Sequence, residues 1–366
     1  MAKTVYDFDK NMNNLPTEQP ELKYYDAKDE TKFGVYGTCC KTEEGYSRFS
    51  ADQRAYVEKV SDGEAWFSRH SAGIQVKFKT DATDIYVKVR NADKFNMTNI
   101  TQIGQCGVDL YVFEERLGKF VFHLTAHGKF DDREYDERIG DFRQLGRKTR
   151  RYIINLPLYI HTEQLEIGVN EWATIEPDVY TNPLKIAVYG SSITHGCSAS
   201  RPGMAYTNIL SRRLDCEFYN YGFSGVCMAE KQVATVLSQN DFDMLIIDSE
   251  PNSGVSQNLK NNLEPFLDEF LSKRKNVPVA LLSRMTFTLD LFDLDRVKLN
   301  KYYVDFMRKV SASYRKKGYG VYFFDQTDVF GMDFTEYTTD GVHPTDYGMV
   351  RIADFYQKVI NKLEKL

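Results

Sequence analysis

A serine in a turn of small residues is the first candidate for chemistry in this sequence. Ser192 lies in the stretch 190–194, Gly-Ser-Ser-Ile-Thr, directly after the apolar run 186–189. That run predicts a buried strand, and a helical pattern begins near Ala205. A strand, a turn and a helix in this order place one side chain at the carboxyl end of a parallel sheet, where open α/β sheets bind ligands. A turn whose hydroxyls only satisfy their own backbone is the plainer alternative.

A histidine near the other end of the chain can supply the base that such a serine needs. His343 follows Asp340 by three residues in the stretch 340–346, Asp-Gly-Val-His-Pro-Thr-Asp. In a tight turn, the carboxylate can fix the imidazole tautomer and leave the other ring nitrogen free to accept the serine proton. His195 is a weaker alternative base, because no carboxylate stands beside it in the sequence. A solvated histidine in a surface turn is the alternative without function.

Two further blocks follow predicted strands and offer hydrogen-bond donors. Residues 220–225, Asn-Tyr-Gly-Phe-Ser-Gly, carry two glycines that let the backbone approach a ligand closely. Asn252 ends the stretch 248–252, Asp-Ser-Glu-Pro-Asn, and its amide could either stabilise an oxyanion or cap a helix. Each block alone is a weak signal, but the four blocks in order, each after a strand, favour one shared site.

The elements that must position these residues fall into two parts. In the first part, apolar and polar residues alternate with a period of two, which indicates half-buried antiparallel strands. The predicted strands here are 74–79, 85–90, 107–113, 119–124, 151–156 and 165–169. The preceding residues, 1 to about 60, are polar and irregular. We expect an all-β sandwich or jelly roll over residues 1–180.

The second part, from residue 184, alternates strand and helix patterns. The predicted strands are 186–189, 218–221, 244–248, 279–282 and 321–324, and the predicted helices include 206–214, 229–237 and 259–271. Such alternation predicts right-handed crossovers and a parallel α/β sheet with helices on both faces. Residues 180–183 form a plausible boundary that is too short for a flexible tether.

Length and composition limit the class of protein. A chain of 366 residues favours two domains. The net charge of −5 offers no basic field for nucleic acid, and no apolar run reaches membrane length. The N-terminus carries no apolar leader segment, so we expect a cytoplasmic protein, or a secreted one if a leader has been removed. The six cysteines fit no zinc pattern and the histidines no metal-ligand spacing, so we expect no cofactor.

The four blocks together resemble those of SGNH/GDSL hydrolases. The resemblance spans about half of the chain, in the stretches 190–194, 220–225, 252 and 340–343. It implies Ser192 as nucleophile, His343 as general base and Asp340 as the carboxylate that orients the base. It also implies an oxyanion hole made of the Ser192 amide, the Gly225 amide and the Asn252 side chain, in a flavodoxin-like domain.

The sequence departs from the family pattern at two points and matches a subgroup at two others. Ser191 stands where the family has aspartate, and the stretch 248–252 replaces the usual Gly-x-Asn-Asp block. The segments 107–111, Gly-Val-Asp-Leu-Tyr, and 201–204, Arg-Pro-Gly-Met, resemble a subgroup with a small N-terminal β-sandwich, as in several carbohydrate esterases. This implies two domains, 1–180 and 184–366.

These observations lead to one expected function and several alternatives. We expect a serine esterase that removes short acyl groups, preferably O-acetyl groups from a carbohydrate, through an acyl-enzyme. The substrate would be a small-molecule or oligosaccharide ester, with no nucleic acid or membrane as partner; the oligomeric state stays open. Alternatives are a short-chain lipid or phospholipid acyl hydrolase, an acyltransferase to a sugar, and a glycan-binding protein with a degenerate hydrolase domain.

The β-domain raises two further expectations. Its aromatic residues Trp66, Phe67, Tyr111 and Phe113 are expected in the core rather than as sugar platforms, because that is the commoner use of aromatic side chains. The domain itself should pack on the second domain and help to shape its pocket, because the active residues sit on loops that need a wall to exclude water. The segment 107–113 is one candidate for part of that wall.

Overall fold

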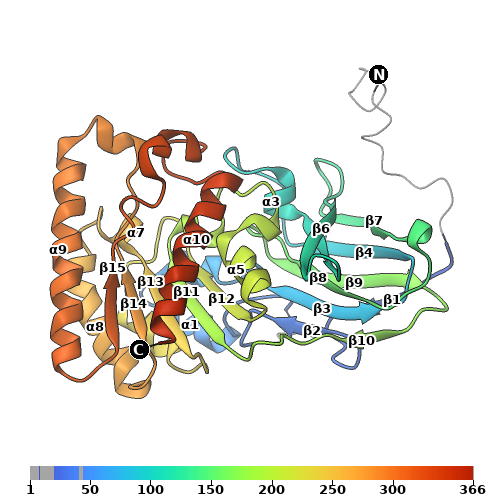
Figure 1. Ribbon diagram of the computed structural model, residues 1–366, viewed down its shortest axis with the longest axis horizontal. Coiled ribbons are helices and arrows are strands. Elements are labelled where there is room, and N and C mark those ends of the chain that lie inside the picture. Colours follow the sequence, from blue (N-terminus) through green and yellow to red (C-terminus); the bar gives the residue numbers. More distant parts are fainter. Residues whose placement is uncertain (1–7, 9–19, 41–43, 366) are drawn as a thin grey trace.

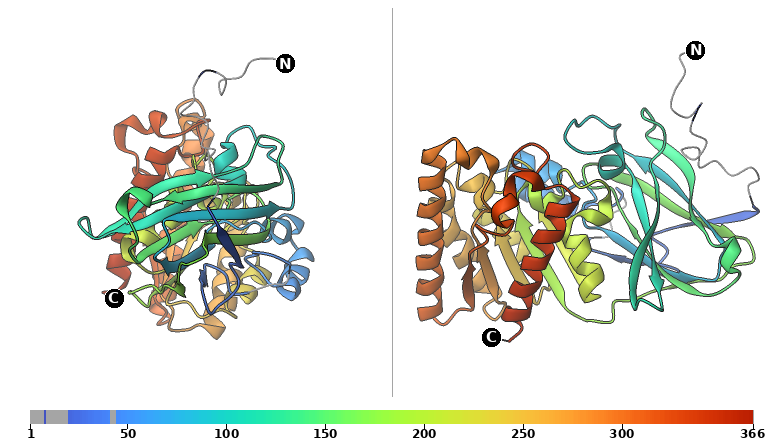
Figure 2. Two further views of the ribbon diagram at one scale, coloured as in Figure 1. Left: turned by 90° about the vertical axis from the view of Figure 1, so that its right-hand side faces the viewer. Right: turned by 45° about the horizontal axis from the view of Figure 1, so that its top comes forward.

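The protein consists of an antiparallel β-domain and an α/β domain that lie side by side along its longest axis (Figure 1). The structure is a computed structural model that describes residues 8, 20–40 and 44–365. Figure 2 shows the same two halves from two further directions, with the β-domain at one end of the molecule. The prediction of an all-β domain followed by an α/β domain is confirmed.

Two antiparallel sheets form the β-domain. One has the strand order β1-β9-β4-β7 and the other β10-β3-β8-β5-β6, with β2 paired to β3. The strands are β1 (Leu22–Asp26), β2 (Gly34–Tyr36), β3 (Gln75–Thr80), β4 (Asp84–Asn91), β5 (Val108–Glu114), β6 (Lys119–Ala126), β7 (Glu134–Asp141), β8 (Arg150–Asn155), β9 (Thr162–Asn170) and β10 (Ile175–Pro177). Fully buried side chains such as Val76, Val87 and Ile154 come from both sheets and form one core between them. The alternation seen in the sequence arises because each strand turns one face to this core.

The N-terminal region is more ordered than the sequence pattern predicts. The described residues before position 70 include β1 and β2 and two helices, α1 (Ala51–Glu58) and α2 (Asp62–Phe67). Helix α1 begins with a capping box between Ser50 and Gln53, but it buries only Val57 within its length, so it shows no apolar stripe. Strand β7 was missed for a similar reason, because charged residues hide its few buried positions.

The α/β domain is built on five parallel strands in the order β12-β11-β13-β14-β15. These are β11 (Lys185–Gly190), β12 (Glu217–Gly222), β13 (Met244–Asp248), β14 (Val279–Leu282) and β15 (Val321–Phe324). In chain order the sheet reads 2-1-3-4-5, which is the flavodoxin-like arrangement. The order reverses between β11 and β13, so a crevice for ligands is expected at the carboxyl ends of these two strands.

Helices cover both faces of this sheet (Figure 1). The helices are α4 (Ser192–His195), α5 (Tyr206–Leu214), α6 (Lys231–Leu237), α7 (Glu250–Ser253), α8 (Leu259–Lys273), α9 (Leu294–Lys316) and α10 (Asp346–Leu363). Helices α5 and α10 pack on one face, through residues such as Leu210 and Ile352. Helices α6, α8 and α9 pack on the other, through residues such as Phe266 and Tyr303. None of the described helices is long and apolar enough to cross a membrane.

Several sets of contacts join the two domains, and the first is made by the segment that carries the N-terminal helices. Phe49 and Val57 are fully buried and belong to the same apolar core as Val233 and Phe266 of the α/β domain. The chain passes from the antiparallel to the parallel sheet between residues 178 and 184, as the sequence suggests. The packing boundary is different, because part of the first 70 residues completes the core of the second domain.

The second contact is a clamp around Asp109, Tyr111, Arg201, Gly203 and Arg212. The fully buried Asp109 carboxylate accepts a hydrogen bond of 2.7 Å from the Gly203 amide and lies 4.0 Å from the Arg201 guanidinium. The Arg212 guanidinium lies 3.8 Å from the centre of the Tyr111 ring. The segment 107–113 therefore joins the domains, and its expected place in an active-site wall stays a prediction.

The third contact is the connecting segment itself. The Tyr180 hydroxyl pairs with Ser211 Oγ of helix α5 at 2.9 Å, and Thr181 and Lys77 both hydrogen-bond to the Asp215 carboxylate, Lys77 Nζ at 3.1 Å. These bonds fix the linker to both halves. The expectation that it is not a flexible tether agrees with this packing.

Candidate active site

A hydrogen-bonded chain of three side chains lies at the carboxyl end of β11. The Ser192 hydroxyl lies 2.8 Å from Nε2 of His343, and Nδ1 of His343 lies 2.7 Å from Oδ2 of Asp340. Asp340 also accepts the amide of His343 at 2.9 Å, so one turn fixes both residues. The three residues singled out in the sequence thus come together. In this arrangement Nε2 can accept the serine proton while Nδ1–H stays on the carboxylate.

The serine is held by a close approach between helix α4 and strand β12. Helix α4 starts at Ser192, a residue that is 7% exposed. A Cβ at Gly222 would lie only 2.1 Å from the His195 amide. Only glycine lets β12 approach the helix so closely. The block 220–225, through Gly222, therefore supports the turn that carries Ser192.

Buried polar groups continue this support. Asn220 donates hydrogen bonds from Nδ2 to the Thr194 carbonyl at 2.6 Å and to Thr207 Oγ1 at 3.0 Å. The fully buried Arg48 guanidinium donates to the carbonyls of Asn220 and Gly222, at 2.9 and 2.7 Å. Burial lowers the pKa of Arg48 to about 9. Arg48 comes from the N-terminal region and carried no signal in the sequence, because a single arginine in a polar stretch has no pattern.

The electrostatics of the turn favour an ionised Asp340. Burial alone would raise the pKa of this carboxyl, but hydrogen bonds from the amide and ring of His343 outweigh it, and the pKa falls to about 2. Burial disfavours the charged form of His343, whereas the Cys197 sulfur and the Asp340 carboxylate favour it, and its pKa rises to about 9. A carboxylate-paired imidazole of this kind suits a general base.

His195, the alternative base, has a different environment. Its ring is fully buried and stacks on Tyr159 with 3.9 Å between ring centres, and its Nε2 lies 2.8 Å from the Leu158 carbonyl. Burial is the main cause that holds its pKa well below the ordinary value. The neutral His195 ring, which donates to a backbone carbonyl, therefore has a structural role. The structure places His343, and not His195, against Ser192.

The candidate oxyanion donors lie around one loop. Gly225 has a φ of +71°, and a Cβ there would meet no atom within 4 Å. The Asn252 amide donates to the carbonyl of Val226 and, at 3.5 Å, to that of Phe223. In this structure Asn252 therefore braces the loop that carries Gly225. Its part as a direct oxyanion donor stays a prediction.

Beneath the turn lies a network of tyrosines that sequence reasoning did not find. Thr194 Oγ1 pairs with the Tyr206 hydroxyl at 2.8 Å, which donates to the Tyr356 hydroxyl at 3.3 Å. Tyr356 in turn donates to Asp248 at 2.7 Å. Burial raises the pKa of Asp248 to about 6. The network ties the nucleophile helix to strand β13 and helix α10.

The β-domain reaches into this site. Asn99, in the loop after β4, donates its amide to Oδ2 of Asp340 at 3.2 Å, and its carbonyl accepts from Ser198 Oγ at 2.6 Å. The Tyr159 hydroxyl donates to the Ser192 carbonyl at 3.2 Å. Neither residue was predicted, because contacts between loops of different domains leave no periodic pattern in the sequence.

A pocket of about 720 Å³ lies between the domains beside these contacts. We call it the interdomain pocket; its wall includes Trp66, Phe67, His70, Asn96, Tyr159 and Ser224. Trp66 is 57% exposed, which corrects the expectation of a core residue, whereas Tyr111 is buried as expected. No triad residue lines this pocket, but two of its residues connect it to the candidate active site: Ser224 adjoins Gly225, and Tyr159 bonds to the Ser192 carbonyl.

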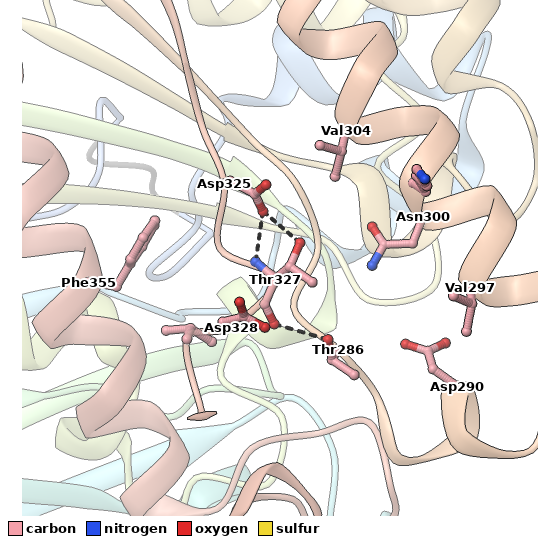
Figure 3. Close-up of a pocket in the computed structure, with 11 residues that line it drawn as sticks. Thr286, Asp290, Val297, Asn300, Val304, Asp325, Thr327, Asp328 and Phe355 are labelled. Carbon is pink, nitrogen blue, oxygen red and sulfur yellow. Dashed lines mark hydrogen bonds between the residues drawn. The ribbon is translucent and has the colours of Figure 1, made fainter. Parts of the chain in front are cut away.

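A second cavity, of about 650 Å³, lies between α9, α10 and the end of β15 (Figure 3). Two of its carboxylates are hydrogen-bonded: Asp325 accepts from Thr327 Oγ1 at 2.6 Å, and Asp290 accepts two bonds from Arg284, which lies outside the cavity wall, at 2.6 and 2.9 Å. No triad residue lines it. Among the described residues, no group of three or more His, Cys, Asp and Glu is placed to hold a metal ion.

Comparisons with known proteins agree with this architecture. Residues 184–361 match the model of the GDSL-like lipase/acylhydrolase family, and residues 22–175 match the model of the N-terminal domain of SGNH hydrolase-type esterases. No curated protein sequence matches the chain.

Solved structures of the same two-domain build are also similar. A protein described as a GDSL-like lipase from Bacteroides ovatus ATCC 8483 has 29% identity and a TM-score of 0.84, over 94% of this chain and 98% of that one. The salicylyl-acyltransferase SsfX3 of a tetracycline biosynthetic pathway has 16% identity and a TM-score of 0.77, with the same coverage. A family two carbohydrate esterase from Cellvibrio japonicus has 12% identity and a TM-score of 0.61, again over 94% and 98%. The two family matches together span nearly the whole chain, which therefore belongs to the GDSL-like lipase/acylhydrolase family, in the form that carries the N-terminal domain of SGNH esterases.

Proposed function

We propose that the protein is a serine esterase that removes short acyl groups, O-acetyl above all, from a carbohydrate. The observation that carries the proposal is the chain from Ser192 Oγ through His343 to Asp340, with distances of 2.8 and 2.7 Å. Membership in a family of lipases and acylhydrolases makes an ester the expected bond. The preference for a carbohydrate is drawn from the two-domain likeness to carbohydrate esterases.

The geometry supports the following steps. The Ser192 oxygen attacks the ester carbon while its proton moves to Nε2 of His343. The oxyanion is stabilised by the amides of Ser192 and Gly225, with Asn252 holding the loop. The bond to the alcohol oxygen then breaks, and Nε2 returns the proton to that oxygen. Water, deprotonated by the same nitrogen, then attacks the acyl carbon; the bond to the Ser192 oxygen breaks, Nε2 returns the proton to that oxygen, and the carboxylic acid leaves. Asp340 keeps the imidazole in the required tautomer throughout.

An acyltransferase is the second candidate. The observation that favours it is the likeness of the whole chain to a salicylyl-acyltransferase. The two reactions share the acyl-enzyme and differ only in whether water or a hydroxyl compound accepts the acyl group. Product analysis separates them: with an acetylated donor and a free sugar present, an esterase releases acetate, whereas a transferase forms a new sugar ester.

The first prediction concerns the nucleophile. An organophosphate such as diethyl p-nitrophenyl phosphate should phosphorylate Ser192 and stop the hydrolysis of p-nitrophenyl acetate, because it reacts with a serine that a neighbouring base activates. Peptide mass spectrometry locates the label. Ser192→Ala should abolish both labelling and turnover while the circular dichroism spectrum stays the same. A label on Ser224 in the same experiment, or turnover near that of the wild type in Ser192→Ala, would reassign the nucleophile.

A further inference from the structure

The interdomain pocket holds a tryptophan in an arrangement that core packing does not require. The Trp66 indole makes edge contacts with Phe67 and His70, with ring centres 4.8 and 4.5 Å apart, yet more than half of its surface is exposed. These contacts fix the ring and leave part of its surface free beside the pocket. A fixed, half-exposed aromatic ring is a ready platform for the apolar face of a flat, otherwise polar ligand.

The rest of the pocket wall is polar but nearly neutral in sum. Its charged residues are the cations Arg69 and Lys94 and the carboxylates Glu44, Asp93 and Glu163. Two of the carboxylates have cationic partners: Glu44 pairs with Arg54, and Glu163 lies 3.0 Å from Arg90. A pocket with such a balance suits neither a phosphate nor a strong cation. It suits hydroxyl groups, which donate to carboxylates and accept from amides such as that of the exposed Asn96.

The pocket is connected to the reacting groups by two of its own residues. Tyr159 lines it and donates to the Ser192 carbonyl at 3.2 Å, and Ser224 lines it and precedes Gly225. A ring bound in the pocket would therefore lie next to the loop that carries Gly225 and the turn that carries Ser192. Apart from Ser224 of the α/β domain, all residues that line the pocket belong to the first 180 residues, most of them to the stretches 66–70, 92–97 and 159–163.

We propose that the interdomain pocket binds the alcohol part of the ester as a neutral sugar ring that stacks on Trp66. This rests on the esterase function proposed above and adds where the sugar sits and which residues select it. The volume of about 720 Å³ is far larger than an acetyl group requires and lies within the ordinary range for small-molecule sites. The β-domain then acts as the substrate-selecting part of the enzyme, and the α/β domain carries the bond-breaking groups.

The chain offers a matched control, because it has only two tryptophans, Trp66 and Trp172. Trp172 is 47% exposed and lies against Arg147, with the guanidinium 4.8 Å from the ring centre. Strand β9 begins at Thr162, beside the pocket, and ends at Asn170, so Trp172 lies near the opposite end of that strand. It has similar exposure and a remote position.

The binding test uses fluorescence and does not depend on turnover. In Trp172→Phe, where Trp66 is the only tryptophan, titration with xylobiose or cellobiose should change the emission saturably. In Trp66→Phe, where only Trp172 remains, the same sugars should change nothing. The absence of a saturable change from both sugars in Trp172→Phe would overturn the proposal. Because this measurement needs no ester, a failure of the esterase function and a failure of the sugar site are read separately.

The kinetic test compares two acetate esters. Trp66→Ala should lower kcat/KM for acetylated xylobiose about tenfold more than for p-nitrophenyl acetate, through a higher KM, and Asn96→Ala should shift this ratio in the same direction. Trp172→Ala should match the wild type on both substrates. An equal loss on both esters from Trp66→Ala would overturn the proposal, and so would a loss that grows with the acyl chain length of p-nitrophenyl esters, since the pocket would then hold the acyl group.

Discussion

At the scale of single residues, the site depends on one local turn and one remote hydroxyl. Asp340 and His343 pair within four residues of sequence, so their partnership could be predicted from spacing alone. Ser192 could be placed by the family pattern of its turn. The Asn99 contact to Asp340 could not, because it joins residues 241 positions apart and depends on how the domains pack.

Removal of the two candidate bases should have different consequences. His343→Ala should lower kcat for p-nitrophenyl acetate by about 10³-fold or more, because no other base lies against Ser192. His195→Ala should cost about 3 kcal/mol of unfolding free energy, through loss of its buried stack on Tyr159, with a much smaller loss of kcat. Steady-state kinetics and urea unfolding of both variants give the comparison. Equal losses of kcat would return His195 to the role of base.

The pKa of His343 should appear in the pH dependence of kcat/KM. The reaction needs the neutral imidazole, so activity should rise with pH as His343 loses its proton. Asp340→Asn removes a carboxylate that favours the imidazolium, which lowers the pKa of His343 and should move the rising limb to lower pH. The maximum should fall, but less than in His343→Ala. Asp333→Asn, at an exposed position, is the control. If the pH profile of kcat/KM rose over the same pH range in Asp340→Asn as in the wild type, this account of the raised pKa would be contradicted.

At the scale of elements, some of the helices and strands that hold the turn around Ser192 can be predicted from the sequence and others cannot. The five parallel strands and their helices follow clear apolar runs, and the structure reproduces nearly all of them. Helices α1 and α2 were not predicted, because they bury too few of their own residues to show a helical stripe. The segment between β2 and α1 nevertheless supplies Arg48, which holds the carboxyl end of β12.

Substitution of Arg48 should therefore affect both stability and catalysis. Its guanidinium donates to four backbone carbonyls, those of Phe67, His70, Asn220 and Gly222, and a lysine cannot reach all four. Arg48→Lys should lower the unfolding free energy by about 3 kcal/mol, because buried carbonyls lose their partners, and should reduce kcat at temperatures where the protein stays folded. Arg116→Lys, with a side chain that is 88% exposed, is the matched control. An Arg48→Lys protein with wild-type stability and kcat would show that β12 is held by other means.

At the scale of the whole molecule, the two domains form one unit through the clamp around Asp109. Both oxygens of this carboxylate accept hydrogen bonds, one from Asn155 at 2.6 Å and one from Gly203 at 2.7 Å. The division of the chain near residue 180 could be predicted from the change in periodicity. The clamp could not be derived in this way, since contacts across an interface have no period.

An amide in place of this carboxylate should weaken the clamp. In Asp109→Asn, the new NH₂ group must face one of two donors, Asn155 or the Gly203 amide, so one bond is lost and a repulsion is added. The unfolding free energy in urea should fall by about 2 kcal/mol. Asp131→Asn, at an exposed loop position, should leave it unchanged. Equal stability of the two variants would mean that the clamp contributes little to joining the domains.

The shared core also dictates an order of events during synthesis. Phe49 and Val57 leave the ribosome early, but their partners Val233 and Phe266 follow only after the whole β-domain has been made. Arg48 is separated from its acceptor Asn220 by 172 residues. Phe49 and Val57 therefore stay without these partners until the α/β domain has been synthesised. This part of the chain is among the first to be made and among the last to complete its packing.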